Sequence, residues 1–311
     1  MSLSLSAVLK APPFVAPSSI TLSRLVETLG IESRVLVVRD AEINNLGMFR
    51  TLGERLLVVY YNEDYREQFD EERQRFSAVL TTSDMADTIP QSLGMLVSEK
   101  PLEDFFAIHR ALAETAHPLY VSKPQSSVIS EAAQIHPTAY VADHDVWIGA
   151  DTVVEPNATI LPRTYIGTGS YICAGVTLGS RGFEFRKEGG RTRFVPHVGG
   201  VAIGDDVVLQ ANTAVARSIF KGASVIGDRS RSDQLVHVAH GVVIGEDVSL
   251  VSSANIAGTS RIGDRTWIGP NATVSNSTYI GSDCWVALGA TIVRDMADGE
   301  RYGGPFSRRM P

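Results

Sequence analysis

From Ile226 to Ile292 an apolar residue recurs at every sixth position. Eleven of the twelve positions in this series are aliphatic, and Ser232 is the exception. The series is Ile226, Ser232, Val238, Ile244, Leu250, Ile256, Ile262, Ile268, Val274, Ile280, Val286 and Ile292. An α-helix repeats every ~3.6 residues and an alternating strand every ~2, so neither produces this spacing. Three short strands per coil, each with one inward side chain, do produce it, so the pattern predicts a parallel β-helix.

A glycine follows every third position of the series, so one coil takes eighteen residues; the glycines are Gly227, Gly245, Gly263 and Gly281. Residues eighteen apart are therefore expected to stack on adjacent coils, about 4.8 Å apart. Two positions before the inward residues, the side chains are small, as a tight corner requires. These corner residues are Ala254, Ser260, Thr266, Ala272, Thr278, Cys284 and Ala290.

The six-residue spacing begins near Ile129, and we expect the β-helix to cover residues 125–295, with a short tail over 296–311. A glycine-rich loop, residues 182–200, interrupts it and carries three phenylalanines and four basic residues. Solenoids tolerate such excursions on their surface and often use them for function. Between Val215 and Ile226 the spacing is eleven rather than twelve, which predicts a one-residue slip in register.

The region before the repeats has the pattern of an α/β domain over residues 20–120, preceded by a flexible arm over 1–19. We expect a linker at 118–124, and histidines such as His109 and His144 on the surface or as helix caps. Expected helices are 21–29 and 101–115, with a helical stretch near 63–76. Buried strands are expected at 35–38 and 56–61, and further strands at 78–81 and 95–97.

Composition narrows the class of protein without identifying it. A chain of 311 residues with 20% charged and 44% hydrophobic residues is typical of a water-soluble, two-domain globular protein. The net charge of -7 disfavours nucleic acid or an anionic membrane as the main partner. The two cysteines lack metal-ligand spacing, which is consistent with a reducing cytosol. We find neither a signal peptide nor an apolar run long enough to span a membrane, and therefore predict a cytoplasmic protein.

The best candidate for chemistry is His240, which follows the inward residue Val238 by two positions. The register predicts that it faces outward near a corner, with Gly222 one coil below and Gly258 one coil above. Neighbours without side chains leave room for a ligand, and the Gly258 N–H is a plausible oxyanion donor. We interpret His240 and Gly258 as catalytic candidates, against the alternative of a surface histidine. His237 is a weaker candidate that equally suits packing against a neighbouring subunit.

These features together resemble the UDP-3-O-acylglucosamine N-acyltransferase family of the lipid A pathway. The resemblance rests on the N-terminal α/β region, the repeats, the Gly-Phe-Glu-Phe sequence at 182–185 and the segment 238–245, and covers roughly residues 20–306. It implies a left-handed β-helix and a homotrimer with active sites between subunits. It also implies that His240 is the general base for an amine that attacks an acyl thioester, and that Gly258 stabilises the oxyanion.

The resemblance also implies substrate-binding residues, with some departures. Asn62 and Tyr65 match the family's uracil pocket, but Val59 stands where an aromatic residue stacks on the base. Gly241 replaces an asparagine, Ser277 replaces a second histidine, and the C-terminal helices that engage acyl carrier protein are not recognised after Pro305-Phe306. The substrate-binding candidates are Asn62, Tyr65, Phe183, Phe185 and His237.

We expect no metal and no cofactor beyond the acyl donor, which is either an acyl carrier protein or coenzyme A. The tail offers Arg294, Arg301, Arg308 and Arg309. The prediction favours a carrier protein docked on Arg308 and Arg309, with coenzyme A phosphates at the same arginines as the alternative.

The sequence is also compatible with three other functions. One is a hexapeptide-repeat sugar N-acetyltransferase that uses acetyl-coenzyme A. Another class is a trimeric zinc enzyme that hydrates carbon dioxide, which needs three imidazoles; His197, His237 and His240 are the candidates. A third is a non-catalytic scaffold.

Overall fold

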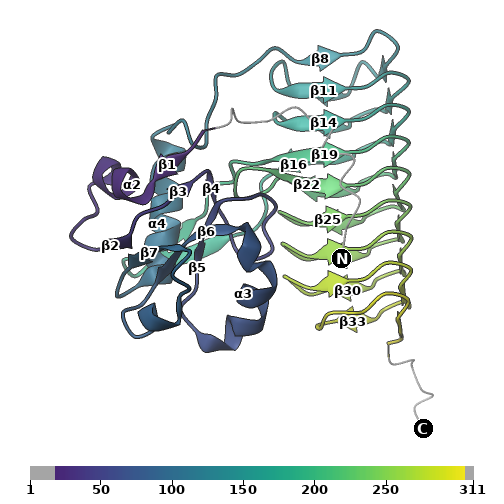
Figure 1. The fold of residues 1–311 in the computed structure, drawn as a ribbon. Coiled ribbons are helices and arrows are strands. Elements are labelled where there is room, and N and C mark those ends of the chain that lie inside the picture. The colour runs from purple at the N-terminus through teal and green to yellow at the C-terminus, as the bar shows by residue number, and fades with distance from the viewer. Residues whose placement is uncertain (1–17, 305–311) are drawn as a thin grey trace.

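The computed structural model describes residues 18–304, as an α/β domain followed by a parallel β-helix (Figure 1). Most of the predicted arm, together with Arg308 and Arg309, lies outside the described residues. The α/β domain lies against the side of the β-helix rather than at its end, as Figure 1 shows. Within residues 18–304, no helix is long and apolar enough to cross a membrane.

Three parallel sheets of eight, nine and eight strands form the walls of the β-helix. The first contains β8 (Val128–Ile129), β11 (Val146–Ile148), β14 (Thr164–Ile166), β19 (Gly200–Ile203), β22 (Ala223–Ile226), β25 (Val243–Ile244), β28 (Arg261–Ile262) and β31 (Tyr279–Ile280). The second contains β9 (Gln134–Ile135), β12 (Val153–Val154), β15 (Tyr171–Ile172), β20 (Val208–Leu209), β23 (Arg231–Ser232), β26 (Ser249–Leu250), β29 (Trp267–Ile268), β32 (Trp285–Val286) and β34 (Arg301–Tyr302). The third contains β10 (Tyr140–Val141), β13 (Thr159–Ile160), β16 (Thr177–Ser180), β21 (Ala214–Ala216), β24 (His237–Val238), β27 (Asn255–Ile256), β30 (Thr273–Val274) and β33 (Thr291–Ile292).

The predicted eighteen-residue register is confirmed. Ile244 pairs with Ile262 in the first sheet, and Val238 pairs with Ile256 in the third. The inward residues form one continuous buried core, and the small corner residues are buried beside them. Ser232, the exception in the series, is also buried, and its hydroxyl lies 3.0 Å from that of Thr213, so the two polar groups satisfy each other inside the core.

Two insertions leave the coil between the third sheet and the first. The longer one contains the hairpin of β17 (Phe185–Glu188) and β18 (Arg191–Phe194). The shorter one lies where a one-residue slip in register was predicted, and that prediction is wrong. Val215 lies in β21 and Ile226 in β22, where regular coils need six residues, so five extra residues form a loop at this corner. The coil also continues beyond residue 295, because β34 pairs with β32.

The α/β domain contains a five-stranded sheet in the order β2-β7-β6-β5-β4. Its helix α2 begins after the N-cap Thr21 and ends at Gly30, which has a φ of 61°. The elements are β1 (Ile20–Thr21), α2 (Leu22–Leu29), β2 (Leu36–Arg39), β3 (Glu42–Ile43), β4 (Asn45–Leu46), β5 (Leu56–Val59), η1 (Glu63–Tyr65), α3 (Arg66–Glu72), η2 (Arg73–Arg75), β6 (Phe76–Thr81), η3 (Ala86–Thr88), β7 (Gly94–Val97) and α4 (Pro101–Glu114).

Side chains of the inner strand β5 alternate between two apolar clusters, with Leu57 and Val59 in one and Leu56 and Val58 in the other. Two expectations for this domain are wrong. The strand predicted at 35–38 is not buried, because β2 is an edge strand and leaves Leu36 62% exposed. The segment predicted as a linker at 118–124 contributes the buried Leu119 and Tyr120 to the domain core.

The two insertions fix the α/β domain to the β-helix. Their apolar residues join the same cluster as the core of the α/β domain, so the two parts share a core there. These residues are Val195, Val198, Ile219 and Phe220. Further along the solenoid, Arg50 forms an ion pair with Asp295 at 2.6 Å, and Arg261 pairs with Glu72 at 2.8 Å. The domain contact therefore spans several coils.

Candidate active site

The His240 side chain lies at the corner that follows β24 and is 14% exposed. The pairing of Val238 with Ile256 places Gly258 directly beside it on the next coil. A Cβ atom on Gly258 would lie 2.4 Å from Cε1 and 2.7 Å from Nε2 of the imidazole. The ring thus fills the space that any other residue at position 258 would need, so the neighbour predicted on this side is confirmed.

The neighbour on the other side is more complex than the sequence indicated. In the third sheet Val238 pairs with Val215, which aligns Arg217 rather than Gly222 with His240. The five-residue insertion separates the two. Gly222 and His240 still line one small cavity of about 10 Å³, although Gly222 is not the counterpart of His240 on the ladder.

The imidazole of His240 is enclosed by groups from the loop at 182–200. The centre of the His197 ring lies 5.6 Å away, and Oε2 of Glu184 lies 3.7 Å from Nε2. Burial, with the Arg186 guanidinium as a smaller cause, lowers the pKa of His240 to about 4. Burial also lowers the pKa of His197 to about 4. Both rings are therefore neutral near pH 7, the state in which an imidazole accepts a proton.

The surroundings of the two nitrogen atoms of His240 differ. Its Nδ1 is buried and has no hydrogen-bond partner within residues 18–304, whereas Nε2 faces Glu184. On the neighbouring coil the Gly258 carbonyl accepts a bond of 2.9 Å from the Ser277 N–H, while the Gly258 N–H donates to no acceptor in that described part of the chain. An imidazole base beside an unused backbone donor is the arrangement that acyl transfer requires.

Tyr65 lies in a separate cavity of about 700 Å³ between the α/β domain and the later coils. Its side chain is 42% exposed, and Val59 lies in the same wall. Asn62 does not line this cavity; its side-chain oxygen Oδ1 accepts the Asp64 N–H at 3.0 Å and caps η1. Tyr61, which the sequence did not single out, lines the cavity instead.

The polar walls of this cavity contain three arginines and also three carboxylates, which are Glu67, Glu71 and Asp295. Arg50 and Arg294 come from opposite sides of the domain junction, and Arg186 comes from the insertion hairpin. Ser277 connects the cavity to His240, because its N–H bonds to Gly258 and its hydroxyl lies 2.8 Å from that of Thr259. Ser277, which lines the cavity of Tyr65, is therefore about two strand spacings from His240 along the β-helix.

Phe183 and Phe185 project from the insertion and are 88% and 43% exposed. Their ring centres are 4.9 Å apart, and Phe185 also contacts Phe194 at 5.4 Å. The loop therefore presents an exposed aromatic pair, separate from the cavity of Tyr65. His237, the remaining binding candidate, is exposed on the third sheet.

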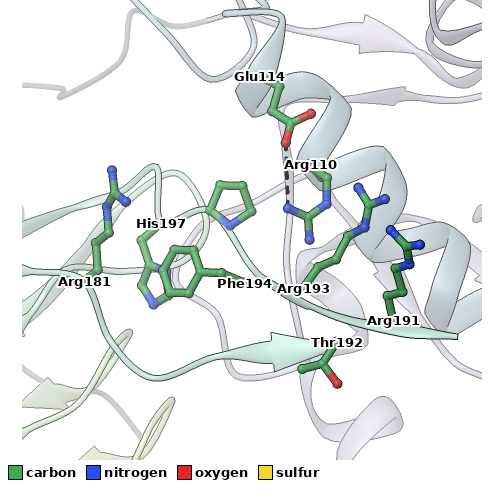
Figure 2. A pocket seen from close by; sticks show the side chains of 9 residues that line it. Arg110, Glu114, Arg181, Arg191, Thr192, Arg193, Phe194 and His197 are labelled. Atoms are coloured by element: carbon green, nitrogen blue, oxygen red, sulfur yellow. Dashed lines mark ion pairs between the residues drawn. The ribbon is translucent and has the colours of Figure 1, made fainter. Parts of the chain in front are cut away.

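A second large cavity, of about 600 Å³, is lined by arginines next to His197 (Figure 2). Arg191 and Arg193 come from β18 and face Arg110 of α4. Arg110 is held by Glu188 at 2.8 Å and Glu114 at 3.8 Å. The sequence identified the basic residues of the hairpin, but α4 joins them only through the fold. Four arginines line this cavity with one carboxylate, so it favours an anion; the fourth is Arg181.

His109 is buried, contrary to the expectation of a surface or cap position. Its Nδ1 lies 2.9 Å from the Tyr120 hydroxyl, and its Nε2 lies 2.8 Å from the carbonyl oxygen of Pro196. Burial lowers the pKa of this imidazole to about 4. The residue therefore joins α4 to the loop that surrounds His240. Within residues 18–304, no group of three or more His, Cys, Asp or Glu side chains is placed to hold a metal ion.

The repeats of this chain match known hexapeptide-repeat families. The family model "Bacterial transferase hexapeptide (six repeats)" matches residues 145–180, and "Hexapeptide repeat of succinyl-transferase" matches 195–217 and 260–294. A UDP-3-O-acylglucosamine N-acyltransferase of Pseudomonas paraeruginosa is 30% identical over 276 residues, covering 78% of this chain and 72% of that protein. The chain belongs to this family.

The extent of similarity varies among the relatives. UDP-3-O-acylglucosamine N-acyltransferase 1 of Francisella tularensis is 30% identical over 192 residues, which is 52% of this chain and 55% of the relative. This chain thus spans about half the length of such relatives. The solved structure of LpxA from Acinetobacter baumannii superposes with a TM-score of 0.52 at 21% identity, covering 58% of this chain and 67% of LpxA. That match concerns the fold, a left-handed β-helix as predicted.

Proposed function

We propose that this family member is an N-acyltransferase, which moves an acyl group from a thioester to the amine of a nucleotide-linked amino sugar. The observation that carries the proposal is the neutral imidazole of His240 packed against Gly258, whose N–H is unused. The relatives' names give the acceptor as a UDP-3-O-acylglucosamine, and we propose an acceptor of that class here.

The reaction follows from these groups. The neutral amine attacks the thioester carbonyl, and the C–N bond forms as Nε2 of His240 takes a proton from nitrogen. The carbonyl oxygen becomes an oxyanion and accepts a hydrogen bond from the Gly258 N–H. The intermediate then collapses, the C–S bond breaks, and the imidazolium returns its proton to the departing thiolate. No cofactor takes part in this scheme.

The cavity of Tyr65 supports a place for the nucleotide. Tyr65 and Tyr61 offer aromatic surface for a base, and Arg186 and Arg294 bring positive charge for a diphosphate, whereas Arg50 is paired with Asp295. A sugar attached to that diphosphate would extend along the wall past Ser277 toward His240. Val59 offers no aromatic face, so one side of the base lacks a stacking partner.

The cavity shown in Figure 2 supports a place for the donor. Both acyl carrier protein and coenzyme A present a phosphate on a pantetheine arm, and the arginines beside His197 suit such a phosphate. We continue to favour a carrier protein as the donor. Its docking on Arg308 and Arg309 concerns residues outside the described part of the chain.

We also propose a homotrimer in the cytoplasm. The cavity at His240 within one chain is only about 10 Å³, far too small for two substrates, so a neighbouring subunit is needed to complete a cleft. Analytical ultracentrifugation at micromolar concentration is expected to show trimers. Monomers alone would contradict a site shared between subunits.

The substrate test is incubation of purified protein with UDP-3-O-acylglucosamine and the same acyl group on carrier protein or on coenzyme A. Mass spectrometry is expected to show a product heavier by one acyl group, formed faster from the carrier protein. Faster turnover from coenzyme A would overturn the donor preference. Absence of product with both donors, together with stoichiometric zinc that is lost on mutation of His240, would favour the metal enzyme instead.

A further inference from the structure

Glu184 stands out among the residues around His240 because it is a carboxylate held beside the imidazole. Its Oε2 lies 3.7 Å from Nε2, and the two side chains are only 17% and 14% exposed. Of the charged groups near this ring, Glu184 and Arg186 come from the insertion, and no other carboxylate within residues 18–304 lies within 4.0 Å of it. The two other histidines nearby are His197 from the same insertion and His237 from the coil of His240 itself.

The position of Glu184 is fixed by the packing of its loop. Gly182 lies so close to both histidines that a Cβ there would be 3.0 Å from Cδ2 of His240 and 3.1 Å from Nε2 of His197. The Glu184 carbonyl accepts the Val195 N–H at 2.9 Å, which closes the base of the hairpin. On its other side the carboxylate pairs with Arg186 at 2.7 Å.

Arg186 is itself restrained, since its guanidinium lies 4.9 Å from the centre of the Phe106 ring. The carboxylate of Glu184 therefore lies between the guanidinium of Arg186 and Nε2 of His240. It is not a surface group that happens to pass near the ring. A carboxylate at this distance favours the protonated imidazole, whereas burial and Arg186 disfavour it.

We propose that Glu184 is a positioning residue for His240, whose negative charge stabilises the imidazolium that forms when Nε2 takes the proton of the attacking amine. The carboxylate takes no part in the proton transfer, in which the proton moves from the amine to Nε2 and then to the departing thiolate. This inference rests on the proposed function for its role in the reaction. The interaction with the imidazole is a property of the resting protein and is testable without substrate.

The test compares the full-length protein with Glu184→Gln, which keeps the shape of the side chain and removes its charge. Histidine labelled with ¹³C is followed by NMR from pH 2.5 to 8, a range that brackets the expected midpoint near 4, and the His240 signal is assigned by its loss in His240→Gln. Glu184→Gln is expected to lower the midpoint by about 1 unit, because an attractive charge near the imidazolium is removed. Arg186→Gln is expected to raise the midpoint, since this substitution removes the repulsive charge.

Glu103→Gln is the matched control, because Glu103 accepts a bond of 3.0 Å from Gly189 N–H at the tip of the same hairpin without contacting His240. Its midpoint is expected to equal that of the wild type. In the acyl-transfer assay, Glu184→Gln is expected to lose about tenfold in kcat/KM and to shift its acidic limb to lower pH, since one pKa unit corresponds to a tenfold change.

An unchanged or higher midpoint in Glu184→Gln would overturn the inference, as would an unchanged or lower midpoint in Arg186→Gln if the first variant fails to fold. A protein without acyl-transfer activity would contradict the proposed function but leave the NMR result to decide the interaction. Loss of activity in Glu103→Gln equal to that in Glu184→Gln would assign the effect to anchoring of the hairpin.

Discussion

Gly258 and His240 occupy one space between adjacent coils, since the imidazole lies where a Cβ atom of residue 258 would be, 2.4 Å from the Cε1 position. Real Cβ atoms do not approach other heavy atoms so closely, so a larger residue would displace the ring. The same glycine supplies the unused N–H beside the imidazole. One residue without a side chain thus sets both the position of the base and the location of the oxyanion donor.

Gly258→Ala is therefore expected to move the imidazole and to lower the rate of acyl transfer by about 10²-fold, because misplacement of a catalytic group by about 1 Å has such a cost. Gly303→Ala is the matched control, since nothing lies within 4 Å of a Cβ at that position. Steady-state kinetics of both variants provide the check. Equal rates for Gly258→Ala and the wild type would mean that His240 does not act from its observed position.

The buried His109 predicts loss of stability in mild acid. Its pKa is about 4 in the folded protein against 6.5 for the free side chain, so the unfolded chain binds the extra proton. Stability is complete above pH 6.5 and falls between pH 6.5 and 4, by about 3 kcal/mol for this group. His109→Gln is expected to be less stable at pH 7.5 but to lose less on acidification. Urea unfolding at pH 7.5 and 5.0 measures the free energy of unfolding and its change with pH in each protein. An equal pH dependence in the variant and the wild type would contradict the assignment of this effect to His109.

The nucleotide cavity is tested without turnover. Tyr65→Ala is expected to weaken binding of uridine diphosphate by about 3- to 10-fold, because stacking on one aromatic face contributes about 0.5–1.5 kcal/mol. Tyr302→Ala is the control, since that tyrosine is equally exposed at 42% but lies in β34 and does not line the cavity. Isothermal titration calorimetry gives the two affinities. Equal affinities in both variants would assign another role to the α/β domain.

The β-helix was predictable because each of its strands points one side chain into the core, and the period of six follows directly from that geometry. The same register placed Gly258 beside His240 correctly. It failed for Gly222, because five extra residues at a corner leave the strands regular and only change the spacing between them. A spacing of eleven is consistent with either a slip or a loop, and only the structure distinguishes the two.

The rest of the site depends on contacts between distant segments, which no local pattern reports. His109 is buried because an insertion 87 residues away brings the Pro196 carbonyl to it. In the sequence Glu184 is an ordinary polar loop residue, and only the folded loop brings it next to His240. Arg110 joins the arginines of β18 for the same reason. Asn62 matched a binding motif, yet its side chain is used locally to cap η1.

The most direct measurement of the central claim is the acyl-transfer rate of His240→Ala beside that of His237→Ala, each with its thermal unfolding curve. The two histidines lie three residues apart, but only His240 packs against Gly258. We expect His240→Ala to fold normally and to lose about 10²–10⁴-fold in rate, as removal of a general base does, and His237→Ala to lose far less. Equal losses in the two variants, or full activity in His240→Ala, would contradict the account.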